Sequence, residues 1–163
     1  MYTLQAQYLA LYPNSLSFTA AAILLLTGIG SYVIFRSVNH QKDLARRTNC
    51  ECTIWGKKPE FITARYKTED EKQHTTVLLC SGWWGIVRHA NYSADLVFSF
   101  AGCAAAGWAA REFTILPWTY AIYMTVLLVQ RCIRDEDRCQ AKYGKTWDEY
   151  CEKVKYRLIP GLW

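Results

Sequence analysis

Long apolar stretches alternate with charged ones along this chain. Residues 16–35 carry no charged side chain over 20 positions, which is about the length that an α-helix needs to cross a bilayer. Residues 93–110 hold one charge among many alanine, glycine and serine residues, a composition typical of tightly packed membrane helices. Residues 114–130 form another apolar run. We therefore predict an all-α integral membrane fold with about three transmembrane helices.

The charged segments predict which side of the membrane each end occupies. Lysine and arginine cluster directly after the first apolar run and again directly after the third. Because positively charged segments next to a span stay on the cytosolic side, we expect both clusters and the C-terminus to be cytosolic. The helix of the first span should continue through residues 39–47. Residues 93–130 should form a helical hairpin that turns at Arg111-Glu112, and residues 131–142 should extend its second helix.

Two smaller elements are predicted in the charged segments. Residues 60–67 alternate loosely between polar and apolar side chains, and residues 74–79 offer a returning strand, so we expect a short β-hairpin. Gly144 is suited to end a helix. Thr146, followed three positions later by Glu149, resembles a capping box at the start of a last short helix.

Length and composition place limits on the class of protein. The 163 residues have room for one domain, and 52% of them are hydrophobic. The chain does not open with a basic segment, a short apolar core and a small-residue cleavage site, so we expect no cleavable signal peptide. Seven cysteines at irregular spacing indicate free thiols in a reducing compartment. Cys50 and Cys52 are the only close pair, and with no second pair we predict no metal site.

The stretch LCSGWWGIVRHANYSAD at residues 79–95 concentrates aromatic, cationic and amide side chains just before the second apolar run. One interpretation is an aromatic belt at the membrane edge. The other is a nucleotide site, in which cations bind phosphates and aromatic faces stack on rings. Lys42 and Arg46, four residues apart on one helix face, are open to the same two interpretations, as membrane anchors or as phosphate ligands. We expect no nucleic acid as partner because the basic residues adjoin a bilayer, and no glycine-rich Rossmann loop is present.

Four segments together resemble the carboxy-terminal part of the sterol reductase family: QKDLARRTN, CTIWGKKPEF, LLCSGWWGIVRHANYSAD and RCIRDEDRCQAKYGKTWDEYCEKVKYRLIPG. The resemblance runs over nearly the whole chain and is greatest to members that reduce the Δ7 double bond of 7-dehydrocholesterol. It implies an all-helical enzyme of the endoplasmic reticulum membrane that uses NADPH to reduce a sterol carbon–carbon double bond. It also implies a sterol substrate, contact with membrane lipid and, as further partners, other enzymes of sterol synthesis.

The resemblance implies roles for particular residues. Lys42 and Arg46 would hold the phosphate end of NADPH, Leu79 and Trp84 would line its nicotinamide end, and Tyr92 or Asp135 would take part in protonating the substrate. The full set of implied cofactor ligands is Lys42, Arg46, Leu79, Trp84, Asn91, Tyr92, Arg131, Asp135, Cys139, Gln140, Ala141, Lys142, Tyr143 and Tyr150.

The chain departs from the family pattern at Ala90, Ala94 and Lys155, and it begins deep inside the family's domain. The resemblance therefore implies the cofactor-binding part of such an enzyme. Two alternatives stay open at this point. One is a membrane methyltransferase of the isoprenylcysteine type, which also has an Arg-His box but would bind S-adenosylmethionine and leave Lys42 and Arg46 without a role. The other is a non-enzymatic membrane scaffold like the lamin B receptor.

Overall fold

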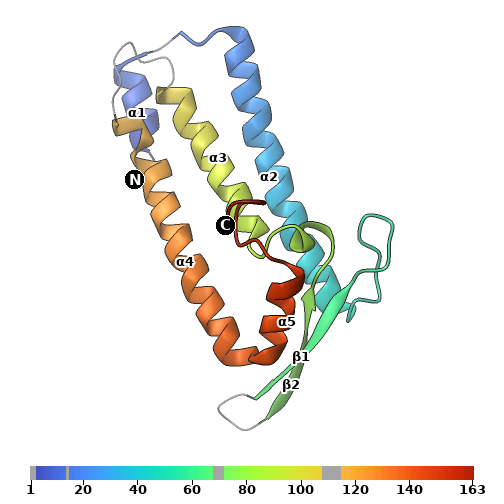
Figure 1. The fold of residues 1–163 in the computed structure, drawn as a ribbon. Helices are drawn as coiled ribbons and strands as arrows, with labels where there is room; N and C mark the ends of the chain where they lie inside the picture. Colours follow the sequence, from blue (N-terminus) through green and yellow to red (C-terminus); the bar gives the residue numbers. More distant parts are fainter. Residues whose placement is uncertain (1–2, 14, 68–71, 108–114) are drawn as a thin grey trace. The chain divides into compact units, whose positions relative to one another are not determined.

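The computed structural model describes residues 3–13, 15–67, 72–107 and 115–163. Its elements follow the chain in the order shown in Figure 1: α1 (Leu4–Leu11), α2 (Phe18–Arg47), β1 (Phe61–Lys67), β2 (Gln73–Leu79), the 3₁₀ turn η1 (Gly82–Gly85), α3 (Ala90–Gly107), the 3₁₀ turn η2 (Leu116–Trp118), α4 (Thr119–Tyr143) and α5 (Lys145–Lys153). The fold is mostly helical with one small antiparallel hairpin, as predicted.

The elements group into two compact units. The first, called here the helical unit, comprises Met1–Phe35 and Tyr92–Gln130. The second, called here the polar unit, comprises Arg36–Asn91 and Arg131–Trp163. The long helices α2 and α4 each contribute their apolar part to the helical unit and their charged part to the polar unit.

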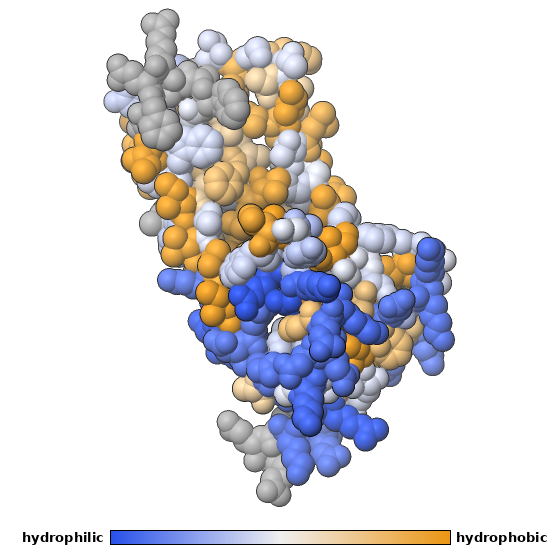
Figure 2. Space-filling model, viewed as in Figure 1, coloured by the Kyte–Doolittle hydropathy of each residue, from blue (hydrophilic) through white to orange (hydrophobic). Residues whose placement is uncertain are grey.

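The surface of the helical unit is apolar. Phe18 is 90% exposed, and Leu25 and Leu26 are 64% and 69% exposed. Figure 2 shows hydrophobic residues spread over the visible face of this unit. An apolar surface of this kind is stable against lipid and costly against water. α2 and α3 also form an apolar groove of about 720 Å³, lined by residues such as Leu24, Ile29 and Phe98.

Among the helices of the described ranges, α2 is the one long and apolar enough to cross a membrane. The other two predicted spans also form helices over the described part of their predicted lengths, and residues 108–110 lie outside the described residues. α3 opens with the polar residues Asn91, Tyr92 and Asp95 and is described only to Gly107. The apolar run before α4 begins as the η2 turn, so only residues 119–130 of that run are α-helical. The predicted turn at Arg111-Glu112 lies outside the described residues.

The predicted β-hairpin is confirmed to within one residue at each strand. β1 and β2 pair antiparallel, with Phe61 opposite Leu79 and Lys67 opposite Gln73. Ala64 and Leu78 point inward and are buried, whereas most other hairpin side chains are exposed. The hairpin buries this face against α5, where Trp147, Tyr150 and Val154 complete a small core. The continuation of the first helix to Arg47 is confirmed as well.

The start of α5 differs from the prediction. The helix begins at Lys145, with Gly144 rather than Thr146 at the N-cap. Gly144 has a positive φ of 53°, and no side chain caps this end of the helix. A left-handed residue between two helices turns the chain sharply, so glycine acts here as the joint between α4 and α5.

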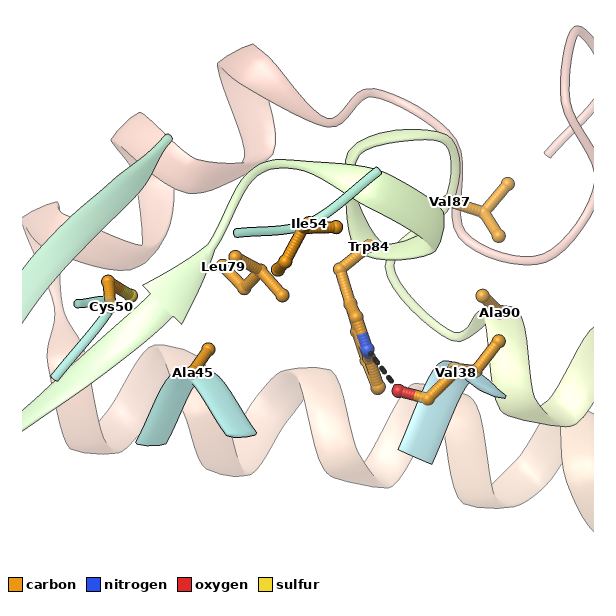
Figure 3. Packing of buried hydrophobic residues seen from close by; sticks show 8 residues of the cluster. All are labelled: Val38, Ala45, Cys50, Ile54, Leu79, Trp84, Val87 and Ala90. Carbon is orange, nitrogen blue, oxygen red and sulfur yellow. Dashed lines mark hydrogen bonds between the residues drawn. The ribbon is translucent and has the colours of Figure 1, made fainter. Parts of the chain in front are cut away.

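A second core lies where the end of α2 meets η1 (Figure 3). The Trp84 ring stands among Val38, Ile54 and Leu79, and its Nε1 donates a hydrogen bond of 2.9 Å to the Val38 carbonyl. Gly82, just before it, has φ +62° and leaves no room for a Cβ beside Gln41 and Ile54. The stretch at residues 79–95 is therefore built into the polar unit by close backbone approach as well as by its aromatic rings.

Candidate functional site

The predicted site residues gather in the polar unit, with the exception of Tyr92. They lie on five elements, α2, β2, η1, α4 and α5, and on the first turn of α3, where Asn91 and Tyr92 are neighbours. Lys42 and Arg46 belong to α2, Leu79 to the end of β2, Trp84 to η1 and Tyr150 to α5. The remaining seven lie on α4: Arg131, Asp135, Cys139, Gln140, Ala141, Lys142 and Tyr143.

Lys42 and Trp84 form the centre of this arrangement. The Nζ atom of Lys42 lies 4.2 Å from the centroid of the Trp84 ring. A cation over an indole face is attracted by the negative π-cloud, by about 0.5–2 kcal/mol depending on desolvation. Trp84 itself is 6% exposed. Its ring is held from behind by the hydrogen bond to Val38. The indole thus places the Lys42 ammonium at a defined point.

The surroundings of Lys42 disfavour its charge. Lys42 lies beyond the uncharged stretch of α2, in the polar unit. Its burial, followed by the nearby charge of Arg46, lowers its pKa from 10.5 to about 8, while Cys139 and Asp135 act in the opposite direction. A half-buried ammonium beside a second cation gains from a bound anion, because the anion replaces lost hydration and offsets the repulsion. Lys42, Arg46, Asp135 and Cys139 are therefore close enough to act on one another electrostatically.

A polar pocket of about 200 Å³ opens beside this centre, between the end of α2, the hairpin and the end of α4. Three of the predicted residues, Arg46, Lys142 and Tyr143, line it together. The rest of its wall comes from Asn49, Tyr66, Thr75, Thr76 and Val77. Two cations, hydroxyl groups and aromatic rings in one small cavity are suited to a phosphate attached to a sugar or a base.

Aromatic rings hold the pocket's lysine in place. The Nζ of Lys142 lies 3.8 Å from the centroid of the Tyr66 ring and 5.4 Å from that of Tyr143. The Tyr66 and Tyr143 rings meet edge to face at 5.7 Å, and His74 stacks on Tyr66 at 5.5 Å. These contacts keep the ammonium at the wall of the pocket, where an anion can reach it, and no ion pair of Lys142 occurs among the described residues.

Tyr150 links α5 to the Trp84 backbone. Its side chain is 4% exposed, and its hydroxyl donates a hydrogen bond of 3.4 Å to the Trp84 carbonyl. Burial raises the pKa of Tyr150 well above its usual value. The phenol is therefore a neutral hydrogen-bond donor that links α5 to η1, rather than a group that loses its proton.

A buried ion cluster joins the Arg88-His89 segment to α4 and the C-terminal tail. Arg88 Nε lies 2.6 Å from Glu136 Oε1, and Arg157 Nε lies 2.6 Å from Glu136 Oε2. The Nη1 of Arg88 also donates to the carbonyls of Val154 and Lys155, at 2.6 Å and 2.9 Å. One carboxylate between two guanidinium groups satisfies both of its oxygens. Such a cluster orients the segment that leads into Asn91.

The charge state of Glu136 follows from these contacts. Burial alone would raise its pKa, but hydrogen bonds from His89 and Arg88 and the charges of both arginines lower it to about 2. The carboxylate is therefore ionised at every physiological pH. His89, Cys132 and Glu136 place possible metal-ligand atoms within 4.8 Å of one another. Both Glu136 oxygens already accept hydrogen bonds from the guanidinium groups of Arg88 and Arg157. The positive charges of these groups make the triad unfavourable for a metal cation.

Not every predicted ligand lies at the pocket. Leu79 is 5% exposed and belongs to the core around Trp84. The side chains of Gln140 and Ala141 are exposed on α4, and the Gln140 carbonyl accepts the Gly144 N–H at 2.9 Å. Asn91 is half-buried at the start of α3.

The structure adds residues that the sequence pattern missed. Tyr66, Thr75 and Thr76 come from the hairpin, which was expected only as an extramembrane excursion, and Asn49 follows the end of α2. A signal for them did exist. The antiparallel register places His74 opposite Tyr66 and Thr75 opposite Arg65, so polar side chains of the two strands lie next to each other. Glu136 was missed because it stands among several charges in the run RDEDR.

Comparison with known proteins agrees with the geometry. The family described as "Ergosterol biosynthesis ERG4/ERG24 family" matches residues 1–163. A 7-dehydrocholesterol reductase from Xenopus laevis is 54% identical over 162 residues, which cover 99% of this chain and 33% of that protein. A 7-dehydrocholesterol reductase from Danio rerio is 51% identical over the same share of each chain. A Delta(14)-sterol reductase from Ascobolus immersus is 39% identical over 163 residues, covering all of this chain and 35% of the relative.

The chain spans about a third of the length of the curated relatives it matches. The match covers every element of both units, including the pocket and the buried ion cluster. It also removes the methyltransferase alternative, because the family matched over the full chain is one of sterol biosynthesis.

Proposed function

Because this chain belongs to the ergosterol biosynthesis ERG4/ERG24 family, we propose that it is the NADPH-binding part of a sterol reductase acting on the Δ7 double bond of 7-dehydrocholesterol. The observation that carries the proposal is the polar pocket, in which Arg46, Lys142 and Tyr143 come together from two helices that are far apart in the sequence. The Δ7 assignment is supported by the 54% and 51% identical relatives, both named 7-dehydrocholesterol reductases.

The residues fit the charge of NADPH. NADPH carries a pyrophosphate and a 2′-phosphate, and the pocket and its rim offer the cations Lys42, Arg46 and Lys142. The lowered pKa of Lys42 also supports the fit, since burial and the neighbouring charge of Arg46 outweigh the opposing effect of Asp135 and a bound anion would relieve both. We assign the 2′-phosphate end of the cofactor to Arg46 and Lys142, and the pyrophosphate, nearer the nicotinamide, to Lys42 beside Trp84.

The chain's own residues also bear on the substrate. When bound, NADPH supplies the hydride of the reduction. Reducing a carbon–carbon double bond with a hydride also needs a proton donor. We propose Tyr92 and Asp135 for this role. Tyr92 is buried at the start of α3, and Asp135 is half-buried on α4, close enough to Lys42 to raise its pKa.

The fold supports a place in a membrane. We propose that residues 16–35 cross the membrane of the endoplasmic reticulum and that the polar unit faces the cytosol, where NADPH is available. α2 is apolar and exposed over this stretch and then becomes cationic from Arg36 onward, which is the charge pattern of a cytosolic helix end. The partners proposed are a sterol, the surrounding lipid and neighbouring enzymes of sterol synthesis.

Titration of NADPH into the chain reconstituted in lipid nanodiscs tests the proposal. Binding should be tighter for NADPH than for NADH, and it should weaken as salt is added. The variant Arg46→Gln should lose most of this affinity. Arg47→Gln is the matched control, because Arg47 is exposed and paired with Asp43 at 3.0 Å. Equal affinity for NADPH and NADH, or an equal loss in both variants, would contradict the proposal.

The reaction needs a separate measurement. Membranes that contain the chain should show NADPH-dependent loss of the conjugated-diene absorbance of 7-dehydrocholesterol. Tyr92→Phe and Asp135→Asn should slow this loss by more than any change in their NADPH affinity accounts for, measured at saturating NADPH. If neither substitution slows the loss of absorbance, the proton donor lies elsewhere.

A further inference from the structure

Residues 54–57 form a tight turn that has an exposed tryptophan with a positive φ at its tip. The backbone of Ile54 and Lys57 is joined by two hydrogen bonds, of 2.9 Å and 3.1 Å, so that Trp55 and Gly56 alone form the tip. Both tip residues have positive φ, 52° and 75°. This is the pattern of a type I′ turn, in which the first tip position is normally asparagine, aspartate or glycine. A tryptophan in this conformation is rare and points to a use for the side chain.

The turn is anchored at its base and open at its tip. Ile54 is 5% exposed and belongs to the core around Trp84, whereas Trp55 is 60% exposed. A Cβ on Gly56 would meet no atom of the described chain within 4 Å. Figure 1 shows the loop between α2 and β1 standing out from the rest of the polar unit. The fold therefore fixes the turn firmly and leaves its largest apolar side chain uncovered.

Trp83 holds Trp55 beside a particular turn of α2. The two indole rings meet edge to face at 5.2 Å. Trp83 Nε1 donates to the Ser37 hydroxyl at 3.1 Å, and its backbone N–H donates to Gln41 Oε1 at 3.0 Å. Ser37 lies only two residues beyond the uncharged stretch that ends at Phe35. The tryptophan pair thus lies beside the first turn of α2 after its apolar part.

Positively charged and apolar side chains lie near the Trp55–Trp83 pair in the sequence. Lys57 and Lys58 follow the tip directly and are exposed. Ile86, which follows Trp83 by three residues, is 42% exposed. Tryptophan prefers the headgroup level of a bilayer, where its ring is in apolar surroundings and its N–H meets polar groups. Lysines at that level are attracted to anionic lipid.

We propose that residues 54–58 form a bilayer-surface anchor, in which Trp55 enters the headgroup layer and Lys57 and Lys58 bind acidic phospholipid. The anchor fixes how the polar unit stands on the membrane, because Ile54 ties it to the core that carries Trp84. The inference rests on the proposed placement of residues 16–35 in the bilayer. It goes beyond the proposed function because the turn takes no part in NADPH binding.

Tryptophan quenching by brominated lipid tests the anchor. The full chain is reconstituted in nanodiscs whose phospholipid carries bromine near the glycerol end, and the loss of emission is compared with that in unbrominated discs. In the variant Trp55→Phe, the emission that brominated lipid quenches should fall by the contribution of one tryptophan out of the chain's seven. Trp147→Phe is the matched control, because Trp147 is 7% exposed in the core under the hairpin. It should lower the unquenched emission instead.

The role of Lys57 and Lys58 is tested by changing the charge of the brominated phospholipid. Bromine on an anionic phospholipid should quench Trp55 more than bromine on a zwitterionic one, and the double variant K57Q/K58Q should abolish this difference while keeping all tryptophans. If Trp55→Phe leaves lipid quenching unchanged and instead removes emission that aqueous iodide quenches, Trp55 faces water or a protein partner and the anchor is wrong. NADPH affinity is measured on the same samples. If the wild type does not bind NADPH, the proposed function is contradicted but the anchor is not, since lipid quenching of Trp55 does not depend on NADPH binding.

Discussion

The ammonium of Lys42 lies 4.2 Å from the centre of the Trp84 ring, and the N–H of that ring is bonded to the Val38 carbonyl one helical turn earlier in the same helix. The helix thus places both the cation and the acceptor that orients the indole beneath it. Because the indole displaces water from Lys42, the pair explains how a lysine near the surface of a small unit has a pKa of about 8.

Cofactor binding should change the protonation of Lys42. In the free chain, Lys42 is about half deprotonated near pH 8. A bound phosphate favours the charged form and raises the pKa again, so NADPH binding at or slightly above that pH should take up protons. Titration calorimetry in buffers with different ionisation enthalpies measures this uptake. The uptake should shrink toward neutral pH, where Lys42 already carries its proton.

Lys42→Arg provides the control for this prediction. Arginine keeps its charge at all accessible pH values, so the variant should bind NADPH without proton uptake. The stability of the free wild-type chain should also gain from Lys42 as pH rises from about 8 to 10.5, since the unfolded chain holds the lysine proton over that range. Uptake of the same size in Lys42→Arg would assign the protons to another group.

Removing the Glu136 carboxylate should destabilise the polar unit. Glu136→Gln leaves the guanidinium of Arg88, which is 7% exposed, without its counter-charge. Breaking a buried ion pair in this way costs about 3–5 kcal/mol. Thermal unfolding in nanodiscs measures the loss. Asp137→Asn is the matched control, because Asp137 neighbours Glu136 but is exposed, and it should change stability by less than about 0.5 kcal/mol.

The same residue predicts an acid limit. Glu136 has a folded-state pKa of about 2 against 4.5 for an unperturbed glutamate. Its contribution is fully present above pH 4.5 and is lost as the pH falls from 4.5 toward 2. Wild-type stability should therefore decline over this range more steeply than that of Glu136→Gln. Parallel declines would show that Glu136 is not ionised by its arginine partners.

Cations in the pocket should control affinity for NADPH. Arg46→Gln and Lys142→Gln should each weaken binding by about 10- to 100-fold, since a hydrogen bond to a charged group contributes about 1.5–3 kcal/mol. The salt dependence should become shallower in both variants. Fluorescence titration with NADPH measures both effects. The pocket is not the phosphate site if Arg46→Gln binds as well as Arg47→Gln.

The ring of Tyr66 should matter more than its hydroxyl. Lys142 lies over the face of this ring at 3.8 Å, so Tyr66→Leu removes the surface that positions the ammonium. Binding of NADPH should weaken about 2- to 5-fold, which corresponds to a cation–π energy of about 0.5–1 kcal/mol. Tyr66→Phe keeps the ring and should bind like the wild type. Equal weakening in both variants would assign the role to the hydroxyl group.

The sequence predicted those parts of the fold that depend on local patterns. The uncharged run before Arg36 predicted the apolar part of α2, and alternation before Lys67 and Leu79 predicted the hairpin. The motif residues Arg46, Lys142 and Tyr143 were predicted to act together, and they do line one pocket. Periodicity and charge are enough for the helix and the hairpin because each is a local pattern, whereas the grouping of the three pocket residues was implied by the family resemblance.

What the sequence did not predict depends on contacts between distant elements. Thr75 and Thr76 look like ordinary strand residues until the register places them beside Arg46. Glu136 is one of several acids in a charged helix, and only the approach of Arg88 and Arg157 distinguishes it. The cap of α5 was misplaced by two residues, because a left-handed glycine was able to begin the helix without a side-chain cap.

The contacts of Arg88 and His89 with the tail affect the order in which the molecule is completed. Their backbone N–H groups donate to the carbonyls of Tyr156 and Arg157, both at 2.9 Å. These partners are made by the ribosome long after the segment they hold, and contacts over such separations form late and slowly. The segment that leads into Asn91 therefore lacks these two backbone partners until residues 156 and 157 have been made. The proposed cofactor site is therefore among the last parts of the chain to be completed.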